Sequence, residues 1–305
     1  MPRRLLSKLI HADQAGLALA LLLLCGVLST LSPVFLTTGN ITNILRDASL
    51  VAIAGFGMVV IILQGEIDLS VGSSQAVVGI LTVVVLNTTH SVAAAIVAGI
   101  LLGALVGLVN GLLVTVARIN SLIATLGMMA ILRGVAMVGT DAVSIQARVT
   151  DFVHVGTGYV GGVPVPVLIA AVLYGGVWFL LHHTPFGRYV YAVGGNREAA
   201  ELAGLPVLRI RVTVFVLGGM LAALSAVVLA SRMNSGQPNA GLGFELQVIA
   251  AVVLGGVSLT GGVGSLLGAL IGILILTVLN NGLVLLNVSS FYHDIARGVV
   301  IILAV

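Results

Sequence analysis

Charge is what this sequence has least of. Asp, Glu, Lys and Arg make up 8% of its 305 residues and hydrophobic residues make up 59%, whereas an average soluble domain is about 25% charged. This composition excludes an ordinary soluble fold and predicts a polytopic membrane protein. The 13 basic residues are scattered singly or in pairs among apolar runs. The positive-inside rule explains them better than a nucleic-acid interface does.

Motifs of catalysis and cofactor binding are missing as well. The sequence has no Gly-rich loop ending in Gly-Lys-Ser or Gly-Lys-Thr, no His-Glu-x-x-His and no Gly-x-Ser-x-Gly, which are the marks of a phosphate-binding loop, a zinc protease and a hydrolase. His182 and His183 are adjacent, so they do not share a helix face as two metal ligands would. Cys25 is the single cysteine, which excludes an intrachain disulfide. We expect no enzymatic activity, no metal and no cofactor in this chain.

What the sequence does contain is a short polar island between two long apolar runs. Residues 65–73 (GEIDLSVGS) follow a charge-free run and precede another that lasts to Ala117. A carboxylate at the centre of a bilayer costs about 2.5–3.5 kcal/mol, so Glu66 and Asp68 belong at an interface, inside protein or beside water. The island predicts a cytoplasmic turn or a broken helix.

A second island, residues 255–265 (GGVSLTGGVGS), repeats this skeleton roughly 190 residues later. Glycine-interrupted helices at matching positions of two halves are typical of transporters, although small residues are also frequent wherever membrane helices pack closely. The pattern favours two repeats, about 12–140 and about 212–305, joined by a linking span and a cytoplasmic segment over about 164–211.

The charge-free runs predict an all-α bundle of about ten spans, with broken or re-entrant helices near 65–73 and 255–265. A polar segment, 37–47, is expected to precede a span near 48–64. The last span starts near Tyr292 and is too short to cross before Val305, so we expect the chain to continue.

Basic residues set the expected orientation. If the N-terminus is cytoplasmic, eight of them fall on the cytoplasmic side, namely Arg3, Arg4, Lys8, Arg118, Arg188, Arg197, Arg209 and Arg211. Only Arg46, Arg148 and Arg232 fall on the other side. This asymmetry predicts that both termini are cytoplasmic. Both islands then turn in the cytoplasmic half, so the repeats are expected to be parallel.

The longest charged stretch contains the signals of a short isolated helix. Asn196 is a suitable N-cap, Glu198 is favourable in the first turn, Gly204 suits the C-terminal end and Pro206 prevents continuation. So short a helix is marginal in water unless it packs against something. It is expected to dock on a partner protein or to rest on lipid headgroups.

These residues carry a resemblance to a known family. Glu198-Ala199-Ala200, with Gly204 beyond it, resembles the coupling motif of ABC importer permeases, and residues 65–73 are similar to the signature of the monosaccharide, ribose-type branch. Further similar segments are 124–134, 182–189, 237–238, 250–256 and 280–283.

The resemblance implies a homodimeric permease of the bacterial inner membrane that imports a monosaccharide, with ribose or another pentose expected. It implies two cytoplasmic ABC ATPase subunits and a periplasmic sugar-binding protein as partners, besides a second copy of the chain and membrane lipid, and no nucleic acid. Coupling to the ATPase is implied for Arg188, Asn196, Glu198, Ala199, Ala200 and Gly204.

Six polar residues are candidates for the translocation path or its gates: Glu66, Asp68, Ser70, Asn110, Asn280 and Asn281. Asp68 also suits an N-cap of a helix that starts at Leu69, and interhelical hydrogen bonds explain the asparagines equally well. Arg133, inside a span, is expected to pair with a carboxylate or with carbonyl groups. Two positions depart from the family pattern, because Glu66 stands where many members have Gly and Gln247 where a common form has Asp.

One alternative function stays open at this stage. A proton-coupled secondary transporter would use Glu66 or Asp68 as a proton relay and would work without partners. Aromatic residues make up only 5% of the chain, which suggests a weak passage whose affinity lies in another subunit. The sequence does not choose among ribose, other pentoses, hexoses and a furanosyl signalling molecule.

Overall fold

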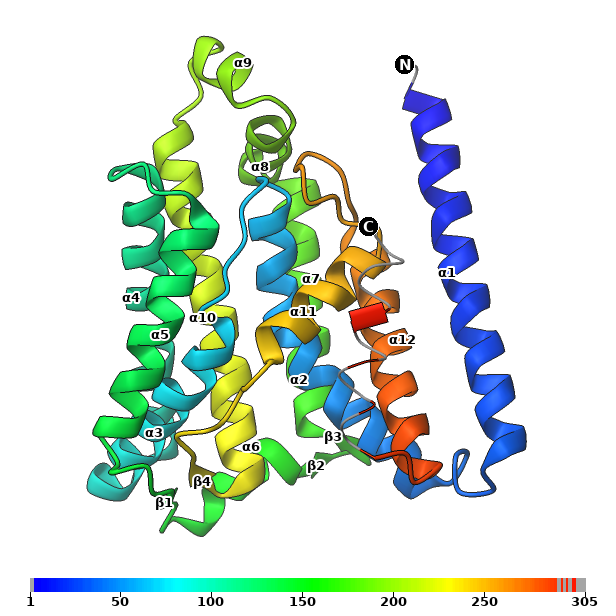
Figure 1. The fold of residues 1–305 in the computed structure, drawn as a ribbon, viewed down its shortest axis with the longest axis vertical. Coiled ribbons are helices and arrows are strands. Elements are labelled where there is room, and N and C mark those ends of the chain that lie inside the picture. The colour runs from blue at the N-terminus through cyan, green and yellow to red at the C-terminus, as the bar shows by residue number, and fades with distance from the viewer. Residues whose placement is uncertain (1–2, 290–291, 293–294, 296–297, 300–305) are drawn as a thin grey trace.

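Membrane-length helices build the structure, a computed structural model that describes residues 3–289, 292, 295, 298 and 299 (Figure 1). In this described part of the chain, eight helices are long and apolar enough to cross a membrane. They are α1 (Arg3–Leu31), α2 (Thr38–Ile62), α3 (Val71–Thr89), α4 (Val92–Thr115), α5 (Ser121–Val138), α7 (Val165–His183), α10 (Val207–Met233) and α12 (Leu266–Leu285). The expected all-α polytopic membrane fold is confirmed.

Two of the ten expected spans differ from this set. The helix α11 (Phe244–Leu254) has 11 residues and rises about 16 Å at 1.5 Å per residue, about half of a bilayer core. The span expected from Tyr292 onward lies mostly outside the described residues.

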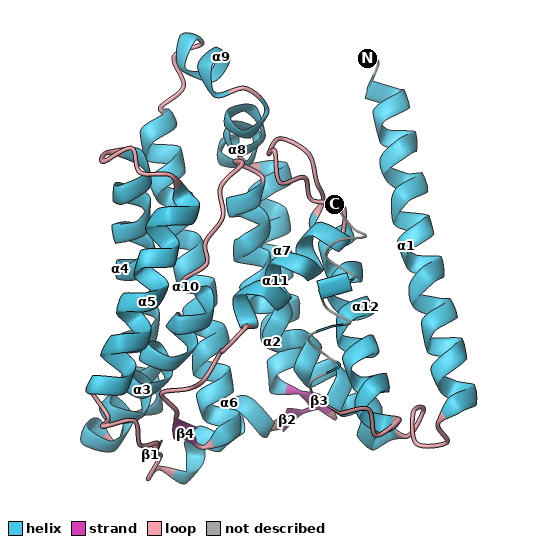
Figure 2. Ribbon diagram, in the orientation of Figure 1, coloured by secondary structure: helices cyan, strands magenta, loops and turns pink. Residues whose placement is uncertain are grey.

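Short elements gather at the two ends of the bundle (Figure 2). One end, called here the strand end, has β1 (Ile145–Gln146) paired antiparallel with β4 (Ser235–Gly236), and β2 (Tyr159–Val160) paired antiparallel with β3 (Val163–Pro164). It also holds η1 (Thr150–Phe152) and α6 (Val153–Thr157). The opposite end, called here the α9 end, has the N-terminus, α8 (Pro185–Gly195) and α9 (Arg197–Leu202).

The helix α10 forms the centre of the bundle, with α4, α2 and α3 packed along it. Its closest approach is to α4, where a Cβ atom on Gly103 or Gly107 would overlap α10 at Gly219 or Phe215. Small residues permit such contact between helix backbones, which is a main source of helix association in membranes.

The helix α2 begins ten residues earlier than the sequence suggested. The segment 37–47 was expected to precede the span, but Thr37 caps a helix that starts at Thr38. Its charged residues find partners in the protein, because Arg46 donates to the carbonyl of Thr157 and Asp47 pairs with Arg232. The boundary predicted from charge alone, at residue 48, is therefore wrong.

Both islands interrupt the helices at the α9 end. In Figure 1, α2 rises to this end and residues 63–70 lead back down to α3, while α11 rises and residues 255–265 lead to α12. The two breaks touch, since the amide of Gly262 donates to the carbonyl of Leu63 at 2.8 Å. The internal duplication itself stays a prediction.

Candidate functional site

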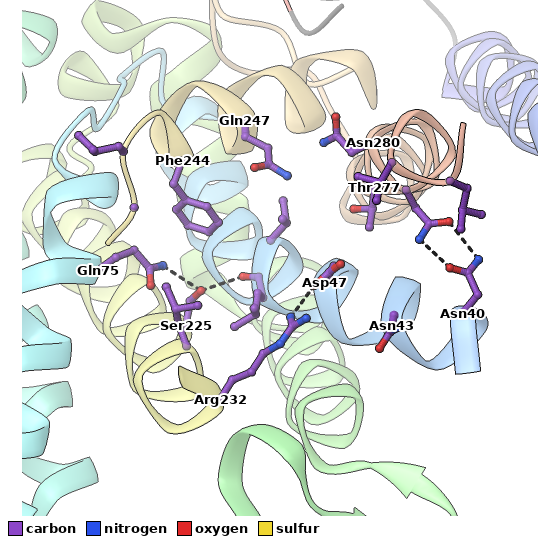
Figure 3. Close-up of a pocket in the computed structure, with 18 residues that line it drawn as sticks. Asn40, Asn43, Asp47, Gln75, Ser225, Arg232, Phe244, Gln247, Thr277 and Asn280 are labelled. Atoms are coloured by element: carbon purple, nitrogen blue, oxygen red, sulfur yellow. Dashed lines mark hydrogen bonds and ion pairs between the residues drawn. The ribbon is translucent and has the colours of Figure 1, made fainter. Parts of the chain in front are cut away.

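The strand-end half of the bundle contains a cavity of about 720 Å³, called here the amide cavity (Figure 3). Its walls come from α2, α3, α10, α11 and α12, and its volume is within the range of about 300–1,000 Å³ usual for small-molecule sites. The polar side chains that line it are Asn40, Asn43, Asp47, Gln75, Ser225, Arg232, Gln247, Thr277, Asn280 and Asn281.

Several of these side chains are held by one another. Asn40 and Asn281 exchange two amide hydrogen bonds of 3.0 and 2.8 Å between α2 and α12. Asp47 pairs with Arg232 across α2 and α10, with side chains 48% and 31% exposed. This ion pair supplies one charge of each sign, so the cavity is neutral as a whole.

Other amide groups face the cavity unpaired. In the described part of the chain, the side chains of Asn43, Gln247 and Asn280 make no hydrogen bond, although all three line the cavity. Each carries a donor and an acceptor. The cavity therefore offers hydrogen bonds to a neutral, hydroxyl-rich molecule.

A second cavity, of about 810 Å³, lies at the α9 end and is called here the charged cavity. It is lined by the first break, the turn before α5, α9 and the first turns of α10, with Glu66, Arg118, Asn120, Ser121, Arg197, Glu198, Glu201 and Arg211 among its side chains. Glu66 forms an ion pair with Arg211, and the two side chains are 14% and 5% exposed. This buried pair joins the first break to α10.

Asp68, Ser70 and Asn110 form one buried cluster that lines neither cavity. The Asp68 carboxylate accepts from the Ser70 amide at 2.8 Å and the Ser70 hydroxyl at 2.6 Å, and the Asn110 amide donates to Ser70 Oγ at 2.9 Å. The helix α3 begins at Val71 with Ser70 as its N-cap. The expectation that Asp68 caps a helix starting at Leu69 is therefore wrong, because Asp68 closes a turn two residues ahead of the cap. A part for this cluster in translocation stays a prediction.

The other path candidates divide between the cavities. Asn280 and Asn281 line the amide cavity and Glu66 lines the charged cavity. Arg133 donates to the carbonyls of Pro238 and Ala240 at 2.7 and 2.9 Å. The expected pairing of Arg133 with carbonyl groups is confirmed.

The short helix expected from the sequence is present as α9. The side chain of Asn196 accepts from the amide of Ala199 at 2.9 Å, and Gly204 ends the helix with a φ of +76°. Ala200 is buried, whereas Leu202 is 91% exposed. An exposed leucine at the tip of the molecule is available to a partner surface, and Arg188, on α8, is also exposed.

The helix α8 connects this tip to both breaks. A Cβ atom on Gly194 would overlap the carbonyl of Leu63 in the first break and crowd Gly262 in the second. The hydroxyl of Tyr191 donates to the carbonyl of Gly264 at 3.1 Å, and burial raises the pKa of Tyr191 further above neutral pH. The helix α8 therefore contacts both breaks directly.

Sequence reasoning used Arg211 and Arg232 only to set orientation. Both lie in the apolar helix α10, and a charge in such a helix needs a partner inside the protein. That rule could have marked both positions, but it names no partner. Gln75 and Thr277 carried no signal beyond being polar in apolar runs.

Comparison with known proteins gives consistent relatives. Residues 40–305 match the family described as the permease component of branched-chain amino acid transport systems. The chain is 46% identical to the ribose import permease protein RbsC of Escherichia coli K12 over 99% of this chain and 95% of that protein. It is 46% identical to RbsC of Bacillus subtilis 168 over 98% and 94%, and 43% identical to the L-arabinose ABC transporter permease protein AraH of Azospirillum brasilense over 96% and 86%. No solved structure matches.

Proposed function

This chain belongs to the family of ABC importer permeases, in its sugar-transporting branch, and from that membership we propose that it carries ribose or another pentose into the cell. The observation that carries the proposal is the amide cavity, which is neutral as a whole and lined by amides and hydroxyls. Such a lining suits a neutral polyol, because every sugar hydroxyl both donates and accepts hydrogen bonds.

We infer that a periplasmic binding protein delivers the sugar at the strand end. Phe244 is the one aromatic residue among the described lining residues of the amide cavity, so stacking contributes little to binding there. Weak binding suits a passage that has to release its substrate. The choice of sugar would then be made by the binding protein. In this orientation the α9 end is cytoplasmic, both termini are cytoplasmic, and the membrane is the bacterial inner membrane.

The charged cavity is proposed as the exit, with the Glu66–Arg211 pair as its closure. Only residues 203–206 separate α9 from α10, so a displacement of α9 moves Arg211 relative to Glu66. Two cytoplasmic ABC ATPase subunits, docked on α9 of this chain and of a second copy, would supply that displacement. Arg188, Asn196, Glu198, Ala199, Ala200 and Gly204 are the proposed coupling residues.

Two substitutions in the coupling segment test this function. Glu198→Arg reverses a charge at the start of α9, and Gly204→Pro removes the residue whose φ is positive. We expect both to abolish ATP-driven ribose uptake and to weaken capture of the ATPase, while the protein stays in the membrane. His182→Gln, on an exposed side chain at the end of α7, is the control and should retain uptake.

Unchanged ATP-driven uptake in both coupling variants would contradict the proposal. The alternative, a proton-coupled transporter that uses Glu66 or Asp68, predicts a different result. It requires uptake by the purified chain alone in liposomes under a pH gradient, without any ATPase. We expect no uptake under those conditions.

A further inference from the structure

Two polar atoms in the walls of the amide cavity have no partner. Gln75, on α3, is 2% exposed and Thr277, on α12, is 4% exposed. Among the described residues, neither Gln75 Oε1 nor Thr277 Oγ1 makes a hydrogen bond. Buried polar groups in native proteins are nearly always bonded, so an unbonded group needs an explanation such as a ligand.

The orientation of the Gln75 amide is fixed by its neighbours. Gln75 Nε2 donates to Ser225 Oγ at 3.0 Å, and the Ser225 hydroxyl in turn donates to the carbonyl of Leu50 at 2.8 Å. Turning the amide over would place its oxygen against a hydroxyl whose proton is already donated. The Oε1 atom of Gln75 is therefore an acceptor without a donor among the described residues.

Thr277 differs from the other buried threonines in its helix bonding. A threonine hydroxyl inside a helix commonly donates to the carbonyl four residues earlier, as Thr82 does to Val78 at 2.7 Å. Thr277 makes no such bond with the rest of the described chain. Its hydroxyl can both donate and accept, and within the described chain it does neither.

The two side chains belong to different walls. In Figure 3, Gln75 lies beside Phe244 on one side of the cavity and Thr277 lies with Asn280 on the other. We propose that Gln75 and Thr277 are specificity-determining residues of the transport path, which recognise two hydroxyl groups of the sugar from opposite walls. This assignment rests on the proposed function, because it takes the ligand to be a neutral pentose.

The assignment also gives the sugar a part in the transport cycle. Both atoms are covered by protein in this conformation, so the sugar reaches them when the walls formed by α3 and α12 move apart. A ligand favours whichever conformation it bonds better. Sugar in the cavity therefore favours the conformation in which Gln75 and Thr277 are uncovered.

The test compares transport of D-ribose with transport of its 2-deoxy, 3-deoxy and 5-deoxy analogues, each at saturating concentration, by the complete importer in cells without other ribose uptake. Thr277→Val removes the hydroxyl and keeps the shape. We expect the maximal rate for ribose to fall about two- to tenfold, the worth of one neutral hydrogen bond. Abundance and melting temperature should stay at the wild-type level or above it, because the hydroxyl has no protein partner.

A matched control and a cycle with the analogues separate recognition from folding. Thr82→Val, at a buried threonine of α3 whose hydroxyl bonds to its own helix, should leave the ribose rate unchanged. For the analogue that lacks the hydroxyl bound by Thr277, the ratio of the ribose rate to the analogue rate should be larger in the wild type than in Thr277→Val. The binding protein is the same in both strains, so its own preference cancels when the two ratios are compared.

Gln75→Met gives a second, independent reading with another analogue. It removes the acceptor and keeps the length of the side chain, and its abundance is checked because Ser225 loses a partner. The assignment would be overturned if the ratio of the ribose rate to the rate of each analogue stayed at its wild-type value in both Thr277→Val and Gln75→Met. Failure of the proposed function looks different, because the wild type and Thr82→Val would then import none of the four sugars.

Discussion

The two cavities are of similar volume, about 720 and 810 Å³, and differ in chemistry. The amide cavity has one ion pair, Asp47–Arg232, among amides and hydroxyls. The charged cavity has three acidic and three basic side chains on its walls. Amides can bond a neutral substrate in many poses, whereas ion pairs hold elements together in defined positions. The difference in lining supports the proposal that recognition belongs to one end of the bundle and mechanical control to the other.

Burial divides the ion pairs of the charged cavity further. The side chains of Glu66 and Arg211 are 14% and 5% exposed, whereas those of Arg197 and Glu201, one turn apart on α9, are 52% and 53% exposed. Breaking a buried pair strands a charge away from water, whereas an exposed pair is screened by solvent. Three substitutions, one in each of these ion pairs and one in the amide cavity, test these differences from the largest expected effect to the smallest.

The largest effect is expected from Arg211→Leu. This change leaves the largely buried Glu66 carboxylate without its partner, and removing one member of a fully buried pair costs about 3–5 kcal/mol, which is the upper limit here. Thermal unfolding of the purified protein should show a strongly lowered melting temperature, and ribose uptake should be lost.

The double variant Glu66→Leu, Arg211→Leu is the control for stranded charge. It should recover most of the stability, because both charges are gone, but not controlled uptake, because the ion pair proposed to close the exit is gone too. A single Arg211→Leu variant as stable as the wild type would show that the pair does not hold the first break to α10.

A smaller effect is expected in the amide cavity from Asn281→Leu. The substitution removes the reciprocal amide bonds to Asn40, which is 7% exposed and keeps one bond, of 2.9 Å, to the carbonyl of Phe35. Stability should fall by about 1–2 kcal/mol, as expected for a buried group that loses its partner.

The neighbouring residue provides the matched control. Asn280 makes no hydrogen bond to the described residues, so Asn280→Leu should change stability by less than about 0.5 kcal/mol while slowing transport. Equal destabilisation by the two variants in denaturant or thermal unfolding would contradict the division between paired and unpaired amides.

Local signals explain what could be predicted from the sequence. The helix α9 has its cap, its terminating glycine and its proline within ten residues of one another, so Asn196, Gly204 and Pro206 indicated it without any tertiary information. Both breaks were indicated by glycines in apolar runs, and the first also by its two carboxylates. Coupling of α9 to a partner stays a prediction, because that contact lies outside the chain.

Pairing over long distances in the chain explains what could not be predicted. Glu66 and Arg211 are 145 positions apart, and Asp47 and Arg232 are 185 apart. No local pattern marks such partners, and in the sequence a charged residue that is paired in the fold looks like the end of a membrane span. For this reason the predicted start of α2 was residue 48 rather than Thr38. The helix α11 was counted among the ten expected spans, but it begins only at Phe244 and ends at Leu254, directly before the break predicted at Gly255 and Gly256, where Gly256 has a φ of +83°.

The smallest effect is expected from Arg197→Gln, in the exposed pair on α9. Arg197 Nε and Glu201 Oε1 are 3.1 Å apart at i, i+4 spacing, and an exposed helical pair contributes only about 0.3–0.5 kcal/mol. Stability and ribose uptake should therefore stay within experimental error of the wild type at physiological salt, in contrast to Arg211→Leu. If uptake were lost while stability stayed normal, Arg197 would have to act on the ATPase rather than on Glu201. The outer wall of the charged cavity would then serve to dock the ATPase, and among the described residues Glu66–Arg211 would be the only ion pair of this cavity with a structural role.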